Sequence, residues 1–96
     1  MNVKVSFHQV DHSDALESFV IKKSSKLSKF LNDSEQLSWV IDFKDKLFKP
    51  NLNMSLNGKV ISVNSKAQDA FSAVNEVFSK AKRLLRKRHG RRVSLH

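Results

Sequence analysis

The sequence contains no cysteine, only one proline and only two glycines among its 96 residues. Without cysteine, the chain has no disulfide, no thiol nucleophile and no thiolate metal ligand. The two glycines, Gly58 and Gly90, are too few for a glycine-rich loop that would hold a phosphate group. No apolar run approaches the length of a membrane span, and the N-terminal residues lack the apolar segment of a signal peptide. We therefore expect a soluble, cytoplasmic protein with no membrane partner.

Groups that could carry out catalysis are equally sparse. The four histidines are scattered along the chain: His8, His12, His89 and His96. His8 and His12 are four residues apart, but the residues between them lack a helical pattern, so ordinary surface histidines are a better interpretation than a metal site. Asp42 and Asp45 flank a lysine-rich stretch, and charge balance explains them better than an acid–base pair does. We expect no catalytic residue, no metal ion and no cofactor, and we interpret the chain as a binding protein, not an enzyme.

The length and the apolar content suit one small domain. A chain of this size buries about 60–65% of its unfolded surface, which is enough for two packed layers and one core. Seven phenylalanines and a hydrophobic fraction of 40% supply that core. Gly90 is expected to end the last helix, because glycine tolerates the left-handed conformation of a helix C-terminus. We therefore predict one domain over residues 1–90 and a short basic tail over residues 91–96.

Hydrophobic periodicity predicts the order of the elements. Apolar and polar residues alternate, as in strands with one buried face, at residues 3–7, 37–43, 52–56 and 61–63. Apolar residues recur every three or four positions, as in helices, at residues 14–31 and 69–92. The dipeptide Asn57-Gly58 is a strong signal for a tight hairpin turn. Residues 44–50 are dense in charge and include Pro50, so this stretch is expected to be a loop.

These elements predict an α+β fold of the order β-α-β-β-β-α. Each strand is apolar on one side only, so both helices should cover the same face of a four-stranded sheet. A right-handed crossover through the first helix should make the first strand parallel to a neighbour. Ser13 is expected to cap the first helix, and Ser65 or Asp69 the last. Trp39 and Phe43 share the apolar side of their strand, so we assign them to the core and not to stacking on nucleic-acid bases.

Positive charge is concentrated in the last predicted helix. Residues 80–92 contain eight basic residues and no acidic one, and so carry +8 of the formal net charge of +9. All five arginines of the chain lie there: Arg83, Arg86, Arg88, Arg91 and Arg92. The planar fork of donors on arginine matches phosphate oxygens, which a surface kept only for solubility would not need. This distribution indicates a polyanionic partner, with nucleic acid favoured over an anionic membrane.

Two rows of basic residues could follow an RNA backbone. The rows are Lys23, Lys26 and Lys29 on the first helix, and Lys80, Arg83 and Lys87 on the last. If the helices lie side by side on the sheet, the rows could form one continuous strip. Contacts to phosphate give affinity without reading bases, so specificity would come from the shape of a structured RNA.

Several short motifs, in the same order along the chain, carry a resemblance to a known family. Residues 69–75 read Asp-Ala-Phe-Ser-Ala-Val-Asn and lead into Lys80, Arg83, Leu85 and Lys87. Residues 26–30 read Lys-Leu-Ser-Lys-Phe, and the Asn57-Gly58 hairpin follows at the expected place. In these motifs the chain resembles the ribosome hibernation promoting factors and ribosome-associated inhibitor A proteins, in their short form. It departs from them at Ala70, Phe71 and Ala81, and at Lys82, where the family often has an acidic residue.

The resemblance implies a β-α-β-β-β-α domain that binds the small ribosomal subunit in stationary phase or stress. Such a domain occupies the channel of messenger and transfer RNA, so it would compete with both and inhibit translation. By position, the implied ribosomal RNA contacts are Lys23, Lys26, Lys29, Lys80, Arg83 and Lys87, with Arg86 and Arg88 as further basic positions. The short form has no C-terminal domain that pairs two ribosomes, so we expect a monomer away from the ribosome.

Two other interpretations of the sequence stay open. A double-stranded RNA-binding domain shares the order of one helix, three strands and one helix. Such a domain would use basic residues at the start of the last helix, whereas here they are concentrated late in it. A regulatory protein that binds an acidic protein partner would bind in a way that survives nuclease treatment and high salt.

Overall fold

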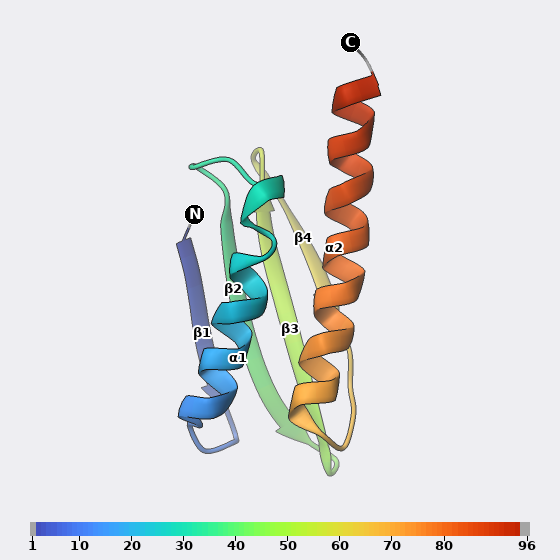
Figure 1. Ribbon diagram of the computed structural model, residues 1–96. Coiled ribbons are helices and arrows are strands. Elements are labelled where there is room, and N and C mark those ends of the chain that lie inside the picture. Colours follow the sequence, from blue (N-terminus) through green and yellow to red (C-terminus); the bar gives the residue numbers. More distant parts are fainter. Residues whose placement is uncertain (1, 95–96) are drawn as a thin grey trace.

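The computed structural model describes the backbone of residues 2–94 and the side chains of residues 2–88. The elements follow the predicted β-α-β-β-β-α order, with a short 3-10 helix after the first α-helix (Figure 1). They are β1 (Asn2–His8), α1 (Asp14–Ser25), η1 (Ser28–Phe30), β2 (Gln36–Lys44), β3 (Leu47–Leu56), β4 (Lys59–Asn64) and α2 (Ala70–Ser94).

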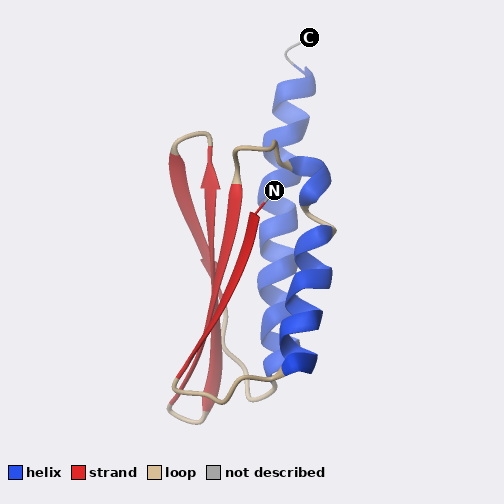
Figure 2. Ribbon diagram, turned by 90° about the vertical axis from the view of Figure 1, so that its left-hand side faces the viewer, coloured by secondary structure: helices blue, strands red, loops and turns tan. Residues whose placement is uncertain are grey.

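The strands form one mixed sheet with the order β1-β2-β3-β4. Strand β1 runs parallel to β2, and the other two pairs of neighbours are antiparallel. Both helices lie on the same face of the sheet, which gives the two layers seen in Figure 2. One layer of helices is sufficient because each strand has only one apolar face to cover. The predicted α+β fold is confirmed.

The core lies between the sheet and the two helices. Its fully buried members, each at most 1% exposed, come from both layers: Val20, Leu27, Leu37, Trp39, Ile41, Leu52, Met54, Val74, Val77, Ala81 and Leu85. The assignment of Trp39 to the core is therefore confirmed. Phe43 and Ile61 were predicted on the same apolar faces, but each is 36% exposed. Phe43 lies near the end of its strand and Ile61 on the edge strand β4, so neither is fully covered.

The stretch 44–50, predicted to be a loop, contains the turn between β2 and β3 and the start of β3. The turn residues Asp45 and Lys46 have φ values of 56° and 65°, the pattern of a two-residue type I′ hairpin. Neither turn residue is a glycine, so the turn carries no glycine signal in the sequence. Pro50 lies in β3 just beyond the last β3–β4 pair and accepts a hydrogen bond from the Ser65 N–H at 3.3 Å. Proline has no backbone N–H to donate, and at this position beyond the last pair it removes no hydrogen bond from the β3–β4 pairing.

Helix α1 ends at Ser25, well before the predicted end at residue 31. Hydroxyl groups compete for the backbone carbonyls in this region. The Ser25 hydroxyl donates to the Lys22 carbonyl at 2.8 Å, and the Ser28 hydroxyl donates to the Ser25 carbonyl at 2.7 Å. The chain then continues as η1, which contacts α2. The early end of α1 thus brings a second basic segment close to the last helix.

The N-termini of both helices are capped by residues that were predicted for this role. The Ser13 hydroxyl accepts a hydrogen bond from the Leu16 N–H at 3.2 Å. The Asp69 carboxylate accepts the Ser72 hydroxyl at 2.7 Å and the Ser72 N–H at 2.8 Å. These two hydrogen bonds hold the pKa of Asp69 below its ordinary value, and the bond from the Ser72 hydroxyl contributes more than the bond from the N–H. The stabilisation by this cap is therefore present above the ordinary carboxyl pKa and is lost as the pH falls through the lowered pKa.

Helix α2 runs through Gly90 to Ser94, so the predicted helix end at Gly90 is wrong. Glycine inside a helix costs only about 1 kcal/mol relative to alanine, and arginines, which are good helix formers, follow it. The last turns of α2 project beyond the end of the sheet (Figure 1). Within residues 2–94, no helix is long and apolar enough to cross a membrane. A functional tail over residues 91–96 stays a prediction, and its last two residues lie outside the described part of the chain.

A buried hydrogen bond between α1 and β2 gives a first testable prediction. The Trp39 indole N–H donates to the Ser24 hydroxyl at 2.8 Å, and both residues are 0% exposed. Ser24→Ala would leave the indole N–H buried without a partner, so the free energy of unfolding should fall by about 1–3 kcal/mol. Urea denaturation followed by the fluorescence of the single tryptophan measures this loss. Ser18→Ala, at an exposed serine of the same helix, should change stability by less than about 0.5 kcal/mol. Equal stability of the two variants would contradict the prediction.

Candidate nucleic-acid interface

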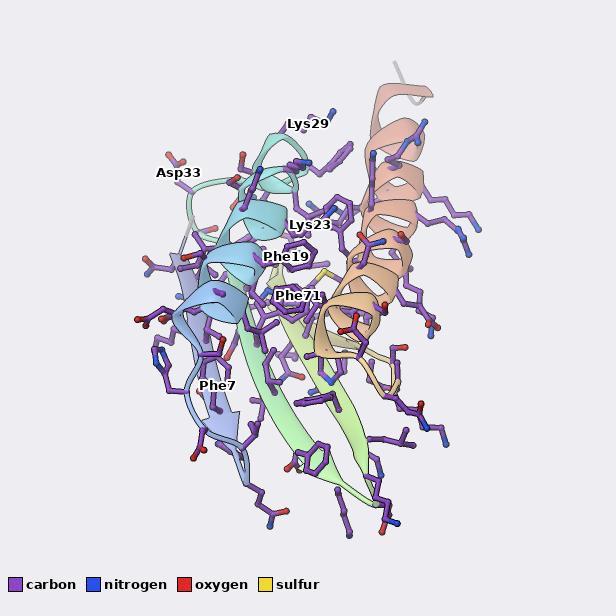
Figure 3. The ribbon with its side chains drawn as sticks, turned by 60° about the horizontal axis from the view of Figure 1, so that its bottom comes forward. Phe7, Phe19, Lys23, Lys29, Asp33 and Phe71 are labelled. Atoms are coloured by element: carbon purple, nitrogen blue, oxygen red, sulfur yellow. The ribbon has the colours of Figure 1, made fainter. Side chains whose placement is uncertain are left out.

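Helices α1 and α2 meet along a row of aromatic side chains. Phe19 of α1 and Phe71 of α2 contact each other edge to face, with ring centroids 5.2 Å apart (Figure 3). Phe78 lies two turns further along α2 and is 8% exposed, whereas Phe71 is 39% exposed. Phe71 belongs by its spacing to the apolar pattern predicted over residues 69–92, but it lies at the outer rim of the contact between the helices. These rings form an apolar floor between α1 and α2.

Two lysines, one from each helix, lie over the same aromatic ring. The Nζ atom of Lys23 is 4.8 Å from the centroid of Phe78, and that of Lys82 is 5.9 Å from it. The ring quadrupole attracts an ammonium group placed in this way. Among the described residues, neither lysine forms an ion pair with a carboxylate. Two neighbouring positive charges without a counter-ion favour the binding of an anion, because a phosphate between them would offset their repulsion.

The positive charge continues along the facing edges of both helices. Lys26 follows Lys23 by three residues, and Arg86 follows Lys82 by four, the spacings that keep side chains on one helix edge. Lys29 extends the row onto η1, beyond the end of α1 (Figure 3). We call the set Lys23, Lys26, Lys29, Lys82 and Arg86 the inter-helix basic surface.

Lys80 lies on the other side of α2. Its Nζ atom donates to the backbone carbonyl of Asn64 at 3.1 Å and is 3.5 Å from a carboxylate oxygen of Glu76. Because Asn64 is the last residue of β4, Lys80 faces that strand and not α1. The structure therefore does not bring Lys80 next to Lys23, as one continuous strip would require.

Arg83 and Lys87 lie on the exposed ridge of α2. Together with Lys82 and Arg86 they line one shallow depression of the surface. Lys82 was not among the contacts predicted from the sequence. Its signal was the four-residue spacing from Phe78, which places the two side chains one above the other on a helix.

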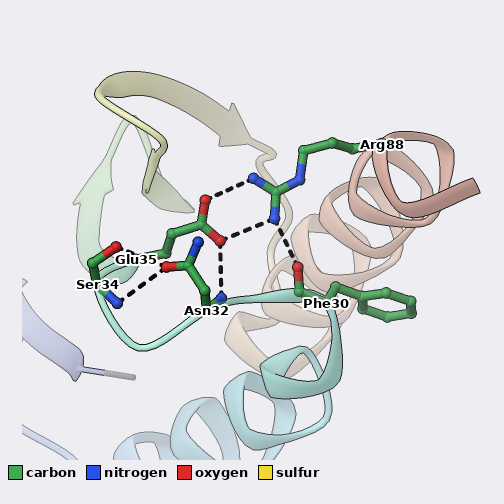
Figure 4. A network of polar contacts seen from close by, with 5 residues as sticks. All are labelled: Phe30, Asn32, Ser34, Glu35 and Arg88. Atoms are coloured by element: carbon green, nitrogen blue, oxygen red, sulfur yellow. Dashed lines mark hydrogen bonds and ion pairs between the residues drawn. The ribbon is translucent and has the colours of Figure 1, made fainter. Parts of the chain in front are cut away.

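Arg88 turns inward and does not join the exposed basic residues (Figure 4). Its Nη1 atom is 2.7 Å from one carboxylate oxygen of Glu35, and its Nη2 atom is 3.0 Å from the other. Nη2 also donates to the backbone carbonyl of Phe30 at 2.7 Å. The hydrogen bonds to Glu35 raise the pKa of the Arg88 guanidinium above its ordinary value. Arg88 follows the buried Leu85 by three residues, so helical spacing already placed it near the core side of α2.

His12, considered with His8 in the sequence, lies instead beside two carboxylates at the start of α1. Its Nε2 atom is 2.8 Å from Glu17, and its Nδ1 atom is 3.4 Å from Asp14. Ligand atoms of the three side chains lie within 4.8 Å of one another, a spacing that would suit a metal ion. His12 and Asp14 are exposed to solvent. We interpret the group as a surface cluster of polar contacts, in which Asp14 and Glu17 lie in the first turn of α1, where negative charge is favourable.

The fold defines a small α+β domain of the type found in ribosomal subunit interface proteins. A solved structure of a ribosomal subunit interface protein from Coxiella burnetii is similar, with a TM-score of 0.80 at 19% identity over 94% of this chain and 99% of that one. The N-terminal domain of Protein Y from Thermus thermophilus has a TM-score of 0.79 at 17% identity, over 91% of this chain and 98% of that one. At these identities the similarity establishes the fold and does not by itself establish the function.

Sequence comparison identifies the family. Residues 3–93 match the Sigma 54 modulation protein / S30EA ribosomal protein family, and the chain belongs to this family of ribosome-associated factors. The ribosome hibernation promoting factor of Klebsiella oxytoca is 28% identical over 87 residues, which cover 91% of this chain and 92% of that protein. The factor of the same name from Salmonella typhimurium is 25% identical over 96 residues, the full length of both chains. The resemblance carried by the sequence motifs is thus confirmed.

Proposed function

We propose that this protein is a hibernation factor that binds the small ribosomal subunit and inhibits translation by occupying it. One observation carries the proposal: lysines from two helices lie over the Phe78 ring, and no described carboxylate pairs with either. In a chain of this family, the anion that suits such a surface best is ribosomal RNA. Inhibition then needs no catalytic residue, because the bound protein excludes other ligands.

The ligands proposed for the inter-helix basic surface are the phosphate groups of an RNA backbone that runs along this surface. The proposed contacts are Lys23, Lys26, Lys29, Lys82 and Arg86, with Arg83 and Lys87 on the ridge of α2. Lys80 would join them where the RNA wraps over α2 towards β4. Arg88 is not included, because its guanidinium is bound to Glu35. Of the phenylalanine floor, Phe78 is 8% exposed and Phe71, at 39%, contacts Phe19 edge to face, so we expect specificity to come from the shape of the RNA and not from base stacking.

Occupancy of the channel for messenger and transfer RNA is the proposed route to inhibition. The described part of the chain is elongated, with extents of 47 × 21 × 20 Å. This shape is better suited to binding in a channel than to binding on a flat surface. Its formal net charge of +9 disfavours self-association and accelerates its encounter with a polyanion. We therefore propose that the protein is a monomer in the cytoplasm until it meets a small subunit.

Sedimentation with small ribosomal subunits tests the proposal. The purified protein is expected to co-sediment with these subunits through a sucrose gradient. Addition of messenger RNA and transfer RNA in excess should move the protein to the top of the gradient, because the ligands compete for one channel. Simultaneous, independent binding of transfer RNA and the protein would contradict the occlusion mechanism.

The same experiment separates the other interpretations of the sequence. A double-stranded RNA-binding domain would bind a plain RNA duplex tightly and would not co-sediment with ribosomes. A protein that binds an acidic protein partner would remain bound after nuclease treatment and at high salt, where contacts to phosphate are lost. The position of the ribosome peak reports whether the protein by itself pairs two ribosomes.

A further inference from the structure

A buried ion pair ties α2 to the segment that follows α1. Glu35, which lies just before β2, is 1% exposed, and its carboxylate is held by both terminal nitrogens of Arg88, 53 residues later in the sequence. The side chain of Arg88 is 25% exposed. One of the two nitrogens also holds the backbone carbonyl of Phe30, the last residue of η1. A guanidinium thus connects three separate parts of the chain (Figure 4).

The same carboxylate organises the turn between η1 and β2. One oxygen of Glu35 accepts the Asn32 N–H at 3.0 Å, and the Glu35 N–H donates to the Asn32 carbonyl at 3.1 Å. The Asn32 side-chain oxygen in turn accepts the N–H and the hydroxyl of Ser34 at 3.0 and 2.8 Å. Removal of either charged partner would therefore loosen the whole segment between Phe30 and Glu35.

The place of this ion pair links it to the inter-helix basic surface. Lys29 immediately precedes Phe30, whose carbonyl Arg88 holds, and Arg86 lies half a turn before Arg88 on α2. Buried ion pairs often contribute little net stability, but they fix the relative position of the elements they join. The distance between Lys29 of η1 and the exposed basic residues of α2 is thus set by contacts that these residues do not make themselves.

We propose that the Arg88–Glu35 pair is a clamp that positions the η1 end of the inter-helix basic surface for RNA. Arg88 is then a positioning residue and not an RNA contact, and this inference rests on the proposed function. RNA backbone reaches several cations at once only if their spacing is held in advance, because ordering them on binding would cost entropy. The clamp maintains that spacing before RNA arrives.

Glu35→Gln tests the clamp because two explanations predict effects of opposite sign. The substitution raises the formal net charge above +9 and leaves Arg88 with a neutral partner, so simple electrostatics predicts tighter binding to small subunits. If Glu35 positions the surface, binding should instead weaken, by roughly 3- to 30-fold. Filter binding or sedimentation at fixed salt measures the affinity, and circular dichroism verifies that the variant is folded. Unchanged or tighter binding would overturn the inference.

A double variant separates positioning from direct contact. Arg88→Met removes a cation and Glu35→Leu removes its partner, so the double variant has the net charge of the wild type and an apolar pair in place of the ionic one. A clamp predicts that the double variant, at equal net charge, recovers most of the wild-type affinity, because an apolar contact joins α2 to the segment again. If Arg88 itself contacts phosphate, the double variant should bind clearly more weakly than the wild type, and this result would overturn the inference.

Hydrogen exchange provides a readout that does not depend on the ribosome. Glu35→Gln should accelerate amide exchange at Asn32 and Ser34 while leaving that of the core strands unchanged. Accelerated exchange with unchanged ribosome affinity would overturn the positioning role and leave the proposed function intact. A wild-type protein that does not co-sediment with small subunits would overturn the proposed function itself, and with it the role of the clamp in RNA binding.

Discussion

The triple variant Lys23→Gln, Lys82→Gln and Arg86→Gln is expected to bind small ribosomal subunits more weakly and with a flatter salt dependence than the wild type. Each neutralised phosphate adds roughly 0.7–0.9 to the slope of log affinity against log salt, so three lost contacts should lower the slope by about two to three units. Between about 50 and 200 mM salt, the wild type should therefore lose roughly 20- to 40-fold more affinity than the variant. A salt titration of filter binding measures both quantities.

The fold should survive these three substitutions. Glutamine is nearly as good a helix former as lysine or arginine. The three cations have no described carboxylate partner, so their removal breaks no ion pair and relieves repulsion along α2. The two lysines also lose their contacts with the Phe78 ring, at about 0.5–1 kcal/mol each, so the free energy of unfolding should fall by at most about 1–2 kcal/mol, and urea denaturation measures it.

Two further triple variants make the comparison specific to the inter-helix basic surface. Lys4, Lys44 and Lys59 are exposed and lie on strands, so changing all three to glutamine lowers the net charge equally without touching the helices. This control should keep most of the affinity. A second variant replaces Lys80, Arg83 and Lys87, the row on the last helix that the resemblance implied, with glutamine. Its loss of affinity for small subunits should be smaller than that of the variant at Lys23, Lys82 and Arg86. If the variant at Lys23, Lys82 and Arg86 folds and binds with unchanged affinity and an unchanged salt dependence, the inter-helix basic surface is not the RNA-binding site.

Phe78→Ala should strongly destabilise the fold. The ring is 8% exposed and packs in the core while Lys23 and Lys82 lie over it. Loss of a buried phenylalanine leaves a cavity and typically costs about 3–5 kcal/mol. For a domain of this size, that cost lowers Tm by roughly 12–40 °C. Thermal unfolding followed by circular dichroism measures the shift.

Phe71→Ala is the matched control for this prediction. It removes the same type of side chain from the same helix, but Phe71 is 39% exposed and touches Phe19 only edge to face. Its loss of stability should be less than half that of Phe78→Ala, because less apolar area leaves the core. Equal destabilisation by the two substitutions would contradict the assignment of Phe78 to the core and of Phe71 to the rim. Ribosome binding has to be compared below the unfolding transition of both variants.

Local patterns in the sequence were sufficient for the architecture. The alternation around Trp39 and the helical spacing around Phe78 each report which side of one element is apolar, and this information lies within a few neighbouring residues. Glycine marks the turn at Gly58, so that hairpin was predicted correctly. The turn at Asp45 and Lys46 adopts the same left-handed conformations without glycine, so its signal was too weak to distinguish it from a loop.

The partner that each cation of α2 meets was decided only by tertiary structure. The sequence by itself determined that α2 is basic, that both helices cover one face of the sheet, and that Trp39 belongs to the core. Packing against α1 then placed Lys82 over the ring beside Lys23, whereas packing against β4 turned Lys80 to the other side. Arg88 found its partner 53 residues away, at Glu35. Such contacts depend on how two distant elements are rotated and spaced against each other, and no local periodicity encodes that geometry.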